Sequence, residues 1–245
     1  MFMVGVIPAL LVFYIRRKVP ESPSWKPATE RSSTLAIVRS HWQLGIYAVV
    51  LMTAFNFFSH GTQDLYPTFL QVQHGFSPHE VGLIAVIYNI GAIIGGLSFG
   101  TMSERFGRRR MIIIASLLSL VVLPLWAFST SAVWLAAGAF LMQVMVQGAW
   151  GVIPVHLNEL SPDDARGTFP GFVYQLGNLI ASVNATLQAG IAVHYGNNYA
   201  LALAVVAGTV AVVIAIVTAL GTEAKGVKFG TGSAPGQGAA VSPAV

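Results

Sequence analysis

Long apolar stretches separated by short polar segments set the organisation of this chain. Six of the stretches are long enough for helices that cross a bilayer, which takes roughly 20 residues each. They are predicted at residues 42–65, 80–101, 111–129, 132–155, 168–193 and 199–220. The spans should be helices, because in lipid each backbone polar group must be bonded within its own segment. We therefore expect an all-α polytopic membrane protein.

The two ends of the chain differ from these six spans. Residues 1–15 are apolar, but as a helix they extend only about 22 Å at 1.5 Å per residue, too short to cross a membrane. We interpret them as the end of a preceding span, followed by a hydrophilic cytoplasmic central loop at 16–40 and a six-span bundle at 41–221. Residues 222–245 are rich in Gly, Ala, Ser and Pro and are expected to form a disordered tail. This order predicts the second half of a larger protein, whose first half would be a partner.

The charges support the same picture. Only 9% of the residues are charged, whereas soluble domains carry about 25%, and the mean hydropathy is +0.69. All 13 Lys and Arg residues fall in alternate loops, so these loops and the tail are predicted to be cytoplasmic in a multi-pass protein of the plasma or inner membrane. Because topology explains every positive charge, no nucleic-acid partner is expected. The absence of cysteine excludes disulfides and thiolate metal sites.

A polar stripe interrupts the first predicted span. Asn56, His60 and Asp64 recur every four residues, so a helix places them on one face. An ionisable residue is costly in hydrocarbon and is therefore a functional-site candidate inside a span. His60 and Asp64 are able to hold and pass a proton, because histidine titrates at about pH 6.5. Ser59 and Gln63 form a second pair one turn apart. The alternative is that the stripe only bonds to neighbouring helices.

A motif begins at the end of the second predicted span and continues to the start of the third, Gly100-Thr101-Met102-Ser103-Glu104-Arg105-Phe106-Gly107-Arg108-Arg109-Arg110. It resembles the loop signature of the major facilitator superfamily, Gly-x-x-x-Asp-Arg/Lys-x-Gly-Arg-Arg/Lys, with Glu104 in place of Asp. The resemblance implies that Glu104 binds neighbouring helix ends. It also implies a gating loop for the inward opening, made of Gly100, Glu104, Arg105, Gly107 and Arg108. The alternative is a tight turn that serves only as a topological anchor.

Two further segments resemble motifs of the same superfamily. Pro20-Glu21-Ser22-Pro23 follows the partial span and is similar to its central-loop motif. Glu159-Leu160-Ser161-Pro162, followed by Arg166-Gly167, is similar to the related motif after the tenth of the twelve spans in members of that superfamily. The three motifs occur in the order and spacing of a carboxyl-terminal half of that superfamily.

The stripe region resembles a narrower branch. Asn56–Thr68 matches Asn-x-x-Ser/Thr-His-x-Ser/Thr-Gln-Asp-x-x-x-Thr, the seventh-span signature of the lactate/pyruvate:proton symporters, which belong to the sialate:proton symporter family. The specified positions are filled by Asn56, Ser59, His60, Thr62, Gln63, Asp64 and Thr68. In the fifth predicted span, Gln175 and Asn178 share a helix face, and the resemblance implies that they bind substrate. The alternative for these two amides is interhelical hydrogen bonding.

These observations predict proton symport of a small monocarboxylate such as lactate or pyruvate across the membrane. His60 and Asp64 would couple the proton, and the substrate would be bound by Asn56, Ser59, Gln63, Gln175 and Asn178. Sialic acid symport and a non-transporting membrane sensor or subunit are the alternatives. No enzyme is expected, because no His-Glu-x-x-His motif and no convincing catalytic dyad occur. No cofactor is expected, and no metal, because His156 and Glu159 alone are too few ligands. The other histidines, including His74, are expected to face water at loop edges.

Overall fold

A computed structural model of the chain describes residues 12, 17, 40–163 and 165–226. Three predicted segments lie outside this described part: the partial span at 1–15 apart from residue 12, the central loop at 16–40 apart from residues 17 and 40, and the tail after residue 226.

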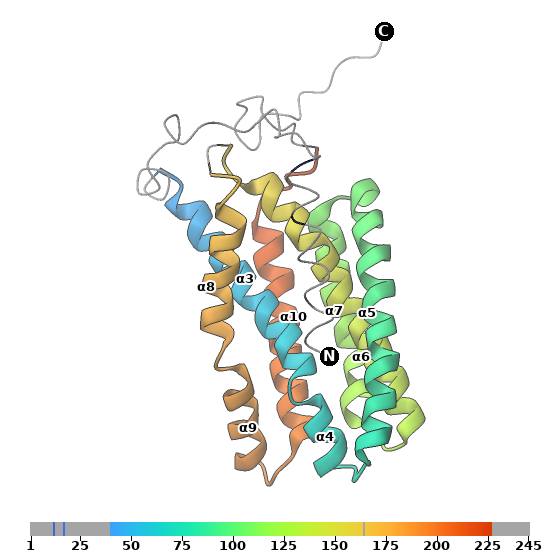
Figure 1. Cartoon of the computed structure of the whole chain (residues 1–245). Coiled ribbons are helices and arrows are strands. Elements are labelled where there is room, and N and C mark those ends of the chain that lie inside the picture. The colour runs from blue at the N-terminus through green and yellow to red at the C-terminus, as the bar shows by residue number, and fades with distance from the viewer. Residues whose placement is uncertain (1–11, 13–16, 18–39, 164, 227–245) are drawn as a thin grey trace.

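Six spans stand side by side in one helical bundle (Figure 1). All six are long and apolar enough to cross a membrane, so the expected all-α polytopic fold is confirmed. The helices are α3 (Trp42–Gln63), α4 (Tyr66–Val72), α5 (Pro78–Phe106), α6 (Arg108–Phe128), α7 (Ala132–Leu160), α8 (Phe169–Ala181), α9 (Asn184–His194) and α10 (Tyr199–Leu220). Helices α3 and α4 together form one span, and α8 and α9 together form another.

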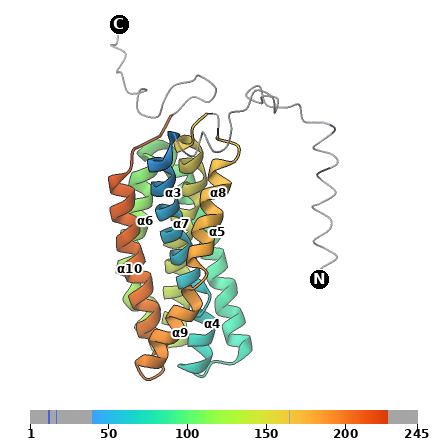
Figure 2. The same ribbon diagram turned by 90° about the vertical axis from the view of Figure 1, so that its left-hand side faces the viewer.

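Both of these spans are interrupted. Helix α3 ends at Gln63, and two residues separate it from α4, whose first turn contains Pro67. Pro67 therefore begins a second helix, where its missing N–H leaves no bond unmade, rather than ending the first. Ser182 and Val183 separate α8 from α9. Figures 1 and 2 show both breaks in the half of the bundle away from the turn between α5 and α6.

The turn between α5 and α6 is shorter than the sequence predicted. Helix α5 continues to Phe106 and α6 begins at Arg108, so Gly107 is the one residue between them. Its φ of +98° lies in the region that favours glycine over every other residue. The motif at 100–110 is therefore helical on both sides of a single-residue turn. We call this end of the molecule the Gly107 end.

Helix α7 lies between α5 and α6, α10 packs against α6 and α3, and α8 packs against α3. Glycines allow α5 and α7 to approach closely: a Cβ on Gly95 would lie 2.2 Å from the Val144 carbonyl oxygen. At the other end of the bundle, the ring of Tyr66 stacks on Trp126 with 5.2 Å between centroids. The Tyr66 hydroxyl lies 3.1 Å from the Leu135 carbonyl oxygen, to which it donates. These contacts fix α4, and with it the position of the break that follows α3.

Candidate functional site

A hollow of about 550 Å³ lies between α3 and α8, beside the breaks in their spans. Four of the predicted site residues line it: His60 and Asp64 from α3 and the residue after it, and Gln175 and Asn178 from α8. Leu179, Ala181 and Ser182 complete the wall. Helical spacing brings the α3 pair to one face, and packing of α3 against α8 brings the two amides opposite.

His60 bridges the two sides of this hollow. Its Nδ1 lies 3.2 Å from Oδ2 and 3.3 Å from Oδ1 of Asp64. Its Nε2 lies 3.3 Å from Oδ1 of Asn178. Both ring nitrogens therefore face an acceptor, and only the protonated imidazolium, which has an N–H at both positions, is able to donate to both. The side chains of His60 and Asp64 are about two-fifths exposed, so the pair is accessible from the hollow.

Three other predicted substrate ligands do not line the hollow. Asn56 is buried, and its Nδ2 lies 3.5 Å from the Tyr174 carbonyl oxygen, a contact that joins α3 to α8. Gln63 Nε2 donates to Ser59 Oγ at 3.0 Å. Ser59 also lies 3.5 Å from Nε2 of Gln147 on α7. Ser59 and Gln63 thus belong to the junction of α3 with α7, next to the hollow but on another side of α3.

Helix α9 adds two buried amides that the sequence did not single out. Gln188 Nε2 donates to the Gly61 carbonyl oxygen at 2.7 Å. Asn184 is 1% exposed, and its Oδ1 would lie 3.5 Å from a Cβ on Gly61. The two amides recur at four-residue spacing, which was their only signal in the sequence. The Gln188 hydrogen bond ties α9 to α3 one residue beyond His60 and so helps to hold the second break in place.

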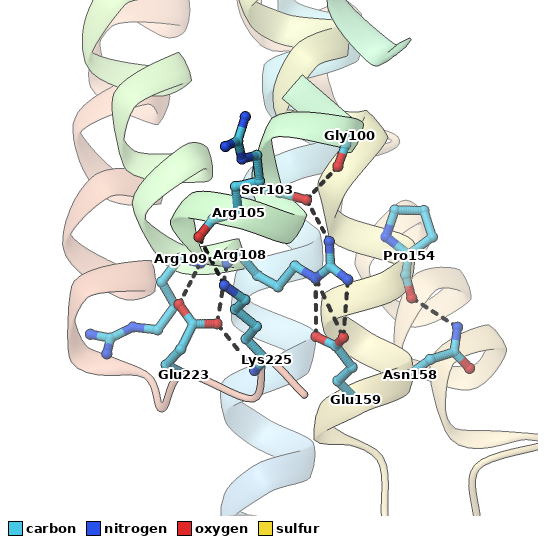
Figure 3. A network of polar contacts seen from close by, with 10 residues as sticks. All are labelled: Gly100, Ser103, Arg105, Arg108, Arg109, Pro154, Asn158, Glu159, Glu223 and Lys225. Carbon is cyan, nitrogen blue, oxygen red and sulfur yellow. Dashed lines mark hydrogen bonds and ion pairs between the residues drawn. The ribbon is translucent and has the colours of Figure 1, made fainter. Parts of the chain in front are cut away.

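A second polar cluster lies at the Gly107 end (Figure 3). Arg108 reaches from the start of α6 to Glu159 on α7, with its Nε 3.2 Å from Oε2 and its Nη2 3.2 Å from Oε1. Its Nη1 donates to Ser103 Oγ at 2.6 Å, and Ser103 Oγ donates to the Gly100 carbonyl oxygen at 2.6 Å. Arg108 and Glu159 are 8% and 6% exposed. This buried, two-point ion pair joins α5, α6 and α7.

The carboxylate at the start of α6 comes from Glu223, just after α10. Its two oxygens each lie 3.2 Å from a backbone nitrogen, of Arg108 and of Arg109 respectively. A carboxylate is stabilised at this position by the N-terminal amides and the helix dipole. The sequence assigned contact with a helix end to Glu104, but Glu104 is exposed and makes no hydrogen bond or ion pair with the described residues. Glu223 carried no motif and was missed.

The remaining predicted gate residues have distinct places. Gly107 forms the turn, Gly100 supplies a carbonyl to Ser103, and Arg108 holds Glu159. Arg105 contributes its backbone carbonyl oxygen, which lies 2.8 Å from Lys225 Nζ. No group of three or more possible metal ligands occurs among the residues that the structure describes.

Comparison of the sequence with known proteins places the chain in a family. Residues 49–242 match the sequence model of the Major Facilitator Superfamily. Over 159 residues, 64% of this chain and 26% of the relative, the chain is 40% identical to a carboxylic acid transporter protein homolog of Saccharomyces cerevisiae. It is 26% identical to the sialic acid transporter NanX of Escherichia coli over 213 residues, 84% of this chain and 52% of the relative.

A third relative is the glucose transporter GlcP of Staphylococcus epidermidis, 30% identical over 121 residues, 49% of this chain and 25% of the relative. The matched part of the chain thus spans between about a quarter and about half of the length of these relatives.

Proposed function

Because the chain belongs to the Major Facilitator Superfamily, a family of membrane transporters, we propose that it is the carboxyl-terminal half of a proton-coupled symporter for a small monocarboxylate such as lactate or pyruvate. The observation that carries the proposal is the position of His60 between Asp64 and Asn178 in a hollow that Gln175 also lines. The relative named as a carboxylic acid transporter homolog supports the substrate class. The share of the relatives that the chain spans supports a first half as partner.

We place the Gly107 end on the cytoplasmic side, because the described arginines at 105–110 and 166 lie there. Both helix breaks, and the hollow beside them, then lie in the outer half of the bundle. In transporters of this kind, substrate sites form near the middle of the membrane where spans are interrupted, and the two halves move around them. The face of α3 and α8 that carries the hollow would meet the first half.

The geometry provides a route for coupling proton to anion. When His60 is protonated, its Nε2–H donates to Asn178 Oδ1, and Asn178 Nδ2 is left to donate to a substrate carboxylate. When His60 is neutral with its proton toward Asp64, Nε2 becomes an acceptor and favours the opposite orientation of the Asn178 amide. Asn178 then presents its oxygen, which repels a carboxylate. Proton binding at His60 thereby creates a donor for the anion.

At the other end, the Arg108–Glu159 pair and the Glu223 contact hold α5, α6, α7 and the end of α10 together. We propose that this cluster closes the cytoplasmic side while the site faces outward. Opening must then separate a buried pair or move it as a unit, and separation of such a pair is costly. The gate therefore acts through Arg108 and its two carboxylates, and Glu104 has no part in the closed arrangement.

The test is reconstitution in vesicles that contain a pH-sensitive dye, with the first half of the transporter supplied in trans. We expect lactate to drive acidification only when both halves are present. His60→Gln keeps a polar side chain but does not titrate, and should reduce proton flux at least tenfold, while His79→Gln, at an exposed position, is its control. Unchanged flux and pH dependence in His60→Gln would refute the coupling role.

Substrate binding has its own matched pair of variants. Asn178→Ala should raise the lactate KM roughly tenfold, because a hydrogen bond to a charged group contributes about 1.5–3 kcal/mol. Asn89→Ala removes an exposed amide whose Nδ2 donates to its own helix at 2.7 Å, and should leave the KM unchanged. A normal KM in Asn178→Ala would assign this amide to helix packing alone.

Sialic acid is the second candidate substrate, favoured by the 26% identity to a sialic acid transporter over 84% of the chain. Competition of sialate and of glucose against lactate uptake separates the three substrate classes named among the relatives. Saturable lactate binding without flux in the presence of both halves would instead indicate a sensor.

A further inference from the structure

A second hollow, of about 490 Å³, lies at the Gly107 end between the start of α6 and the end of α10. Four basic residues and one acidic residue line it, together with apolar residues of α5, α6 and α10. The basic residues are Arg105, Arg109, Arg110 and Lys225, and the acidic residue is Glu223. We propose that this hollow binds the phosphate of an anionic phospholipid headgroup.

The single carboxylate does not neutralise the hollow. Both oxygens of Glu223 are occupied by the amide nitrogens of Arg108 and Arg109, each at 3.2 Å, and Oε1 also lies 3.3 Å from the Lys225 nitrogen. Its charge is thus directed at the start of α6, which it caps. The four basic side chains are left with an excess of positive charge that attracts anionic lipids at a membrane surface.

One of the arginines is held in position by the protein. Arg109 Nε donates to the Thr218 carbonyl oxygen at 2.9 Å, and its Nη2 donates to the Ala219 carbonyl oxygen. These carbonyls belong to the last turn of α10, where a cation is favoured by the helix dipole. A guanidinium has five N–H donors, so Arg109 keeps others for a phosphate while it anchors one wall of the hollow.

Two arginines on the rim have their side chains available. Arg105 and Arg110 are exposed, and neither side chain forms a hydrogen bond or ion pair with any residue in the described part of the chain. Guanidinium groups bind phosphate oxygens through two parallel hydrogen bonds, which makes arginine well suited to this ligand. The hollow therefore combines one fixed donor with two adaptable donors.

The apolar part of the wall favours a lipid over a soluble phosphate. Phe106, which is 53% exposed, and Ile113 line the same hollow as the arginines. Phe106 is the last residue of α5, and Ile113 lies in the second turn of α6, so both are near the level where headgroups meet acyl chains. A soluble phosphate has no apolar atoms to pack against these side chains, whereas the glycerol and acyl carbons of a lipid would cover them. A lipid fits the hollow whichever side the Gly107 end faces, provided only that the helices span a membrane.

The test uses the whole chain purified in a non-ionic detergent. It is titrated separately with short-chain phosphatidylglycerol, short-chain phosphatidylcholine and inorganic phosphate. Tryptophan fluorescence follows thermal unfolding, and native mass spectrometry counts bound lipid. The variants are Arg110→Gln and the double variant Arg105→Gln/Arg110→Gln. Arg166→Gln is the control, since it removes one charge at the same end of the molecule without touching the hollow.

We expect phosphatidylglycerol to bind and to raise the unfolding midpoint, and phosphatidylcholine to do neither. Each arginine near the membrane surface contributes to the free energy of binding an anionic lipid. Arg110→Gln should therefore weaken phosphatidylglycerol binding roughly fivefold, and the double variant roughly 25-fold. Arg166→Gln should bind as the parent does. Equal effects of the two lipids, or unchanged binding in the double variant, would overturn the proposal.

An equal effect of inorganic phosphate would assign the hollow to a soluble anion and overturn the lipid. No flux is measured, so the result is independent of the transport proposal.

Discussion

Replacement of Gly95 by alanine tests the packing on which the bundle depends. The added Cβ would lie 2.2 Å from the Val144 carbonyl oxygen and 2.7 Å from its Cα, whereas ordinary contact begins at 3.4 Å. The obstructing atoms are backbone, so no side-chain rotation relieves the clash. Helices α5 and α7 would have to separate locally by about 1 Å, which forfeits up to half of the dispersion energy between the atoms that face each other there.

The expected cost follows from this displacement. Overpacking of a well-packed interface typically costs about 1–3 kcal/mol, and we expect the upper part of that range because backbone meets backbone along α5 and α7. Gly82 on the same helix has no atom within 4 Å of a built Cβ. Gly82→Ala should therefore be neutral or stabilise by up to about 1 kcal/mol, through helix propensity alone. The two variants should differ by roughly 2–4 kcal/mol.

The assay is equilibrium unfolding in mixed detergent micelles, followed by circular dichroism at helical wavelengths. Gly96→Ala is an intermediate control, because its Cβ would meet the Gln147 carbonyl oxygen at 3.5 Å, an ordinary contact. If Gly95→Ala were as stable as Gly82→Ala, backbone packing of α5 against α7 at Val144 would be refuted.

Two further predictions concern charge. Glu159→Gln should destabilise the fold by about 3 kcal/mol in the same unfolding assay, because it leaves the buried Arg108 guanidinium unpaired. Its control, Glu104→Gln, should change the stability by less than about 0.5 kcal/mol. Equal effects of the two variants would contradict the role of the Arg108–Glu159 pair. Burial lowers the pKa of His74, so between that lowered pKa and about 6.5 the unfolded chain binds more protons than the folded one. The resulting stability is present above about pH 6.5 and is lost as the pH falls. His74→Gln should therefore reduce the dependence of the thermal unfolding midpoint on pH between about pH 5 and 7. An unchanged dependence on pH in this variant would exclude His74 as its source.

Local rules account for what was predictable in the candidate site. Periodicity alone placed His60 one turn from Asp64 and Gln175 near Asn178, because the spacing of a helix is the same in every environment. The contact of His60 with Asn178 joins residues 118 apart in sequence and depends on how α3 packs against α8. The resemblance to the symporters named both residues but not their mutual distance, and their roles stay predictions.

The breaks in the spans show why the sequence predicted the spans themselves but not the interruptions within them. Pro67 lies next to the first break, but a proline is compatible with the end of one helix or with the first turn of another. The packing of Tyr66 against Trp126 favours the first turn of α4. Ser182 and Val183 carry no comparable signal. His74, expected in water, is partly buried between Phe69 and Phe76, with ring centroids 4.8 and 5.6 Å away. Each of these outcomes depends on neighbours distant in sequence.

The sequence by itself determined that the helices lie in a lipid bilayer, how many described spans there are, and which helix faces carry polar groups. These follow from hydropathy and helical period, because lipid leaves a single spanning segment no alternative to the helix. Only the tertiary structure decided that Glu159 and Glu223, rather than Glu104, meet the start of α6. It also decided that two separated spans break beside one hollow. Such pairings arise from packing between elements, and the relative placement of helices is not encoded in the period of any one of them.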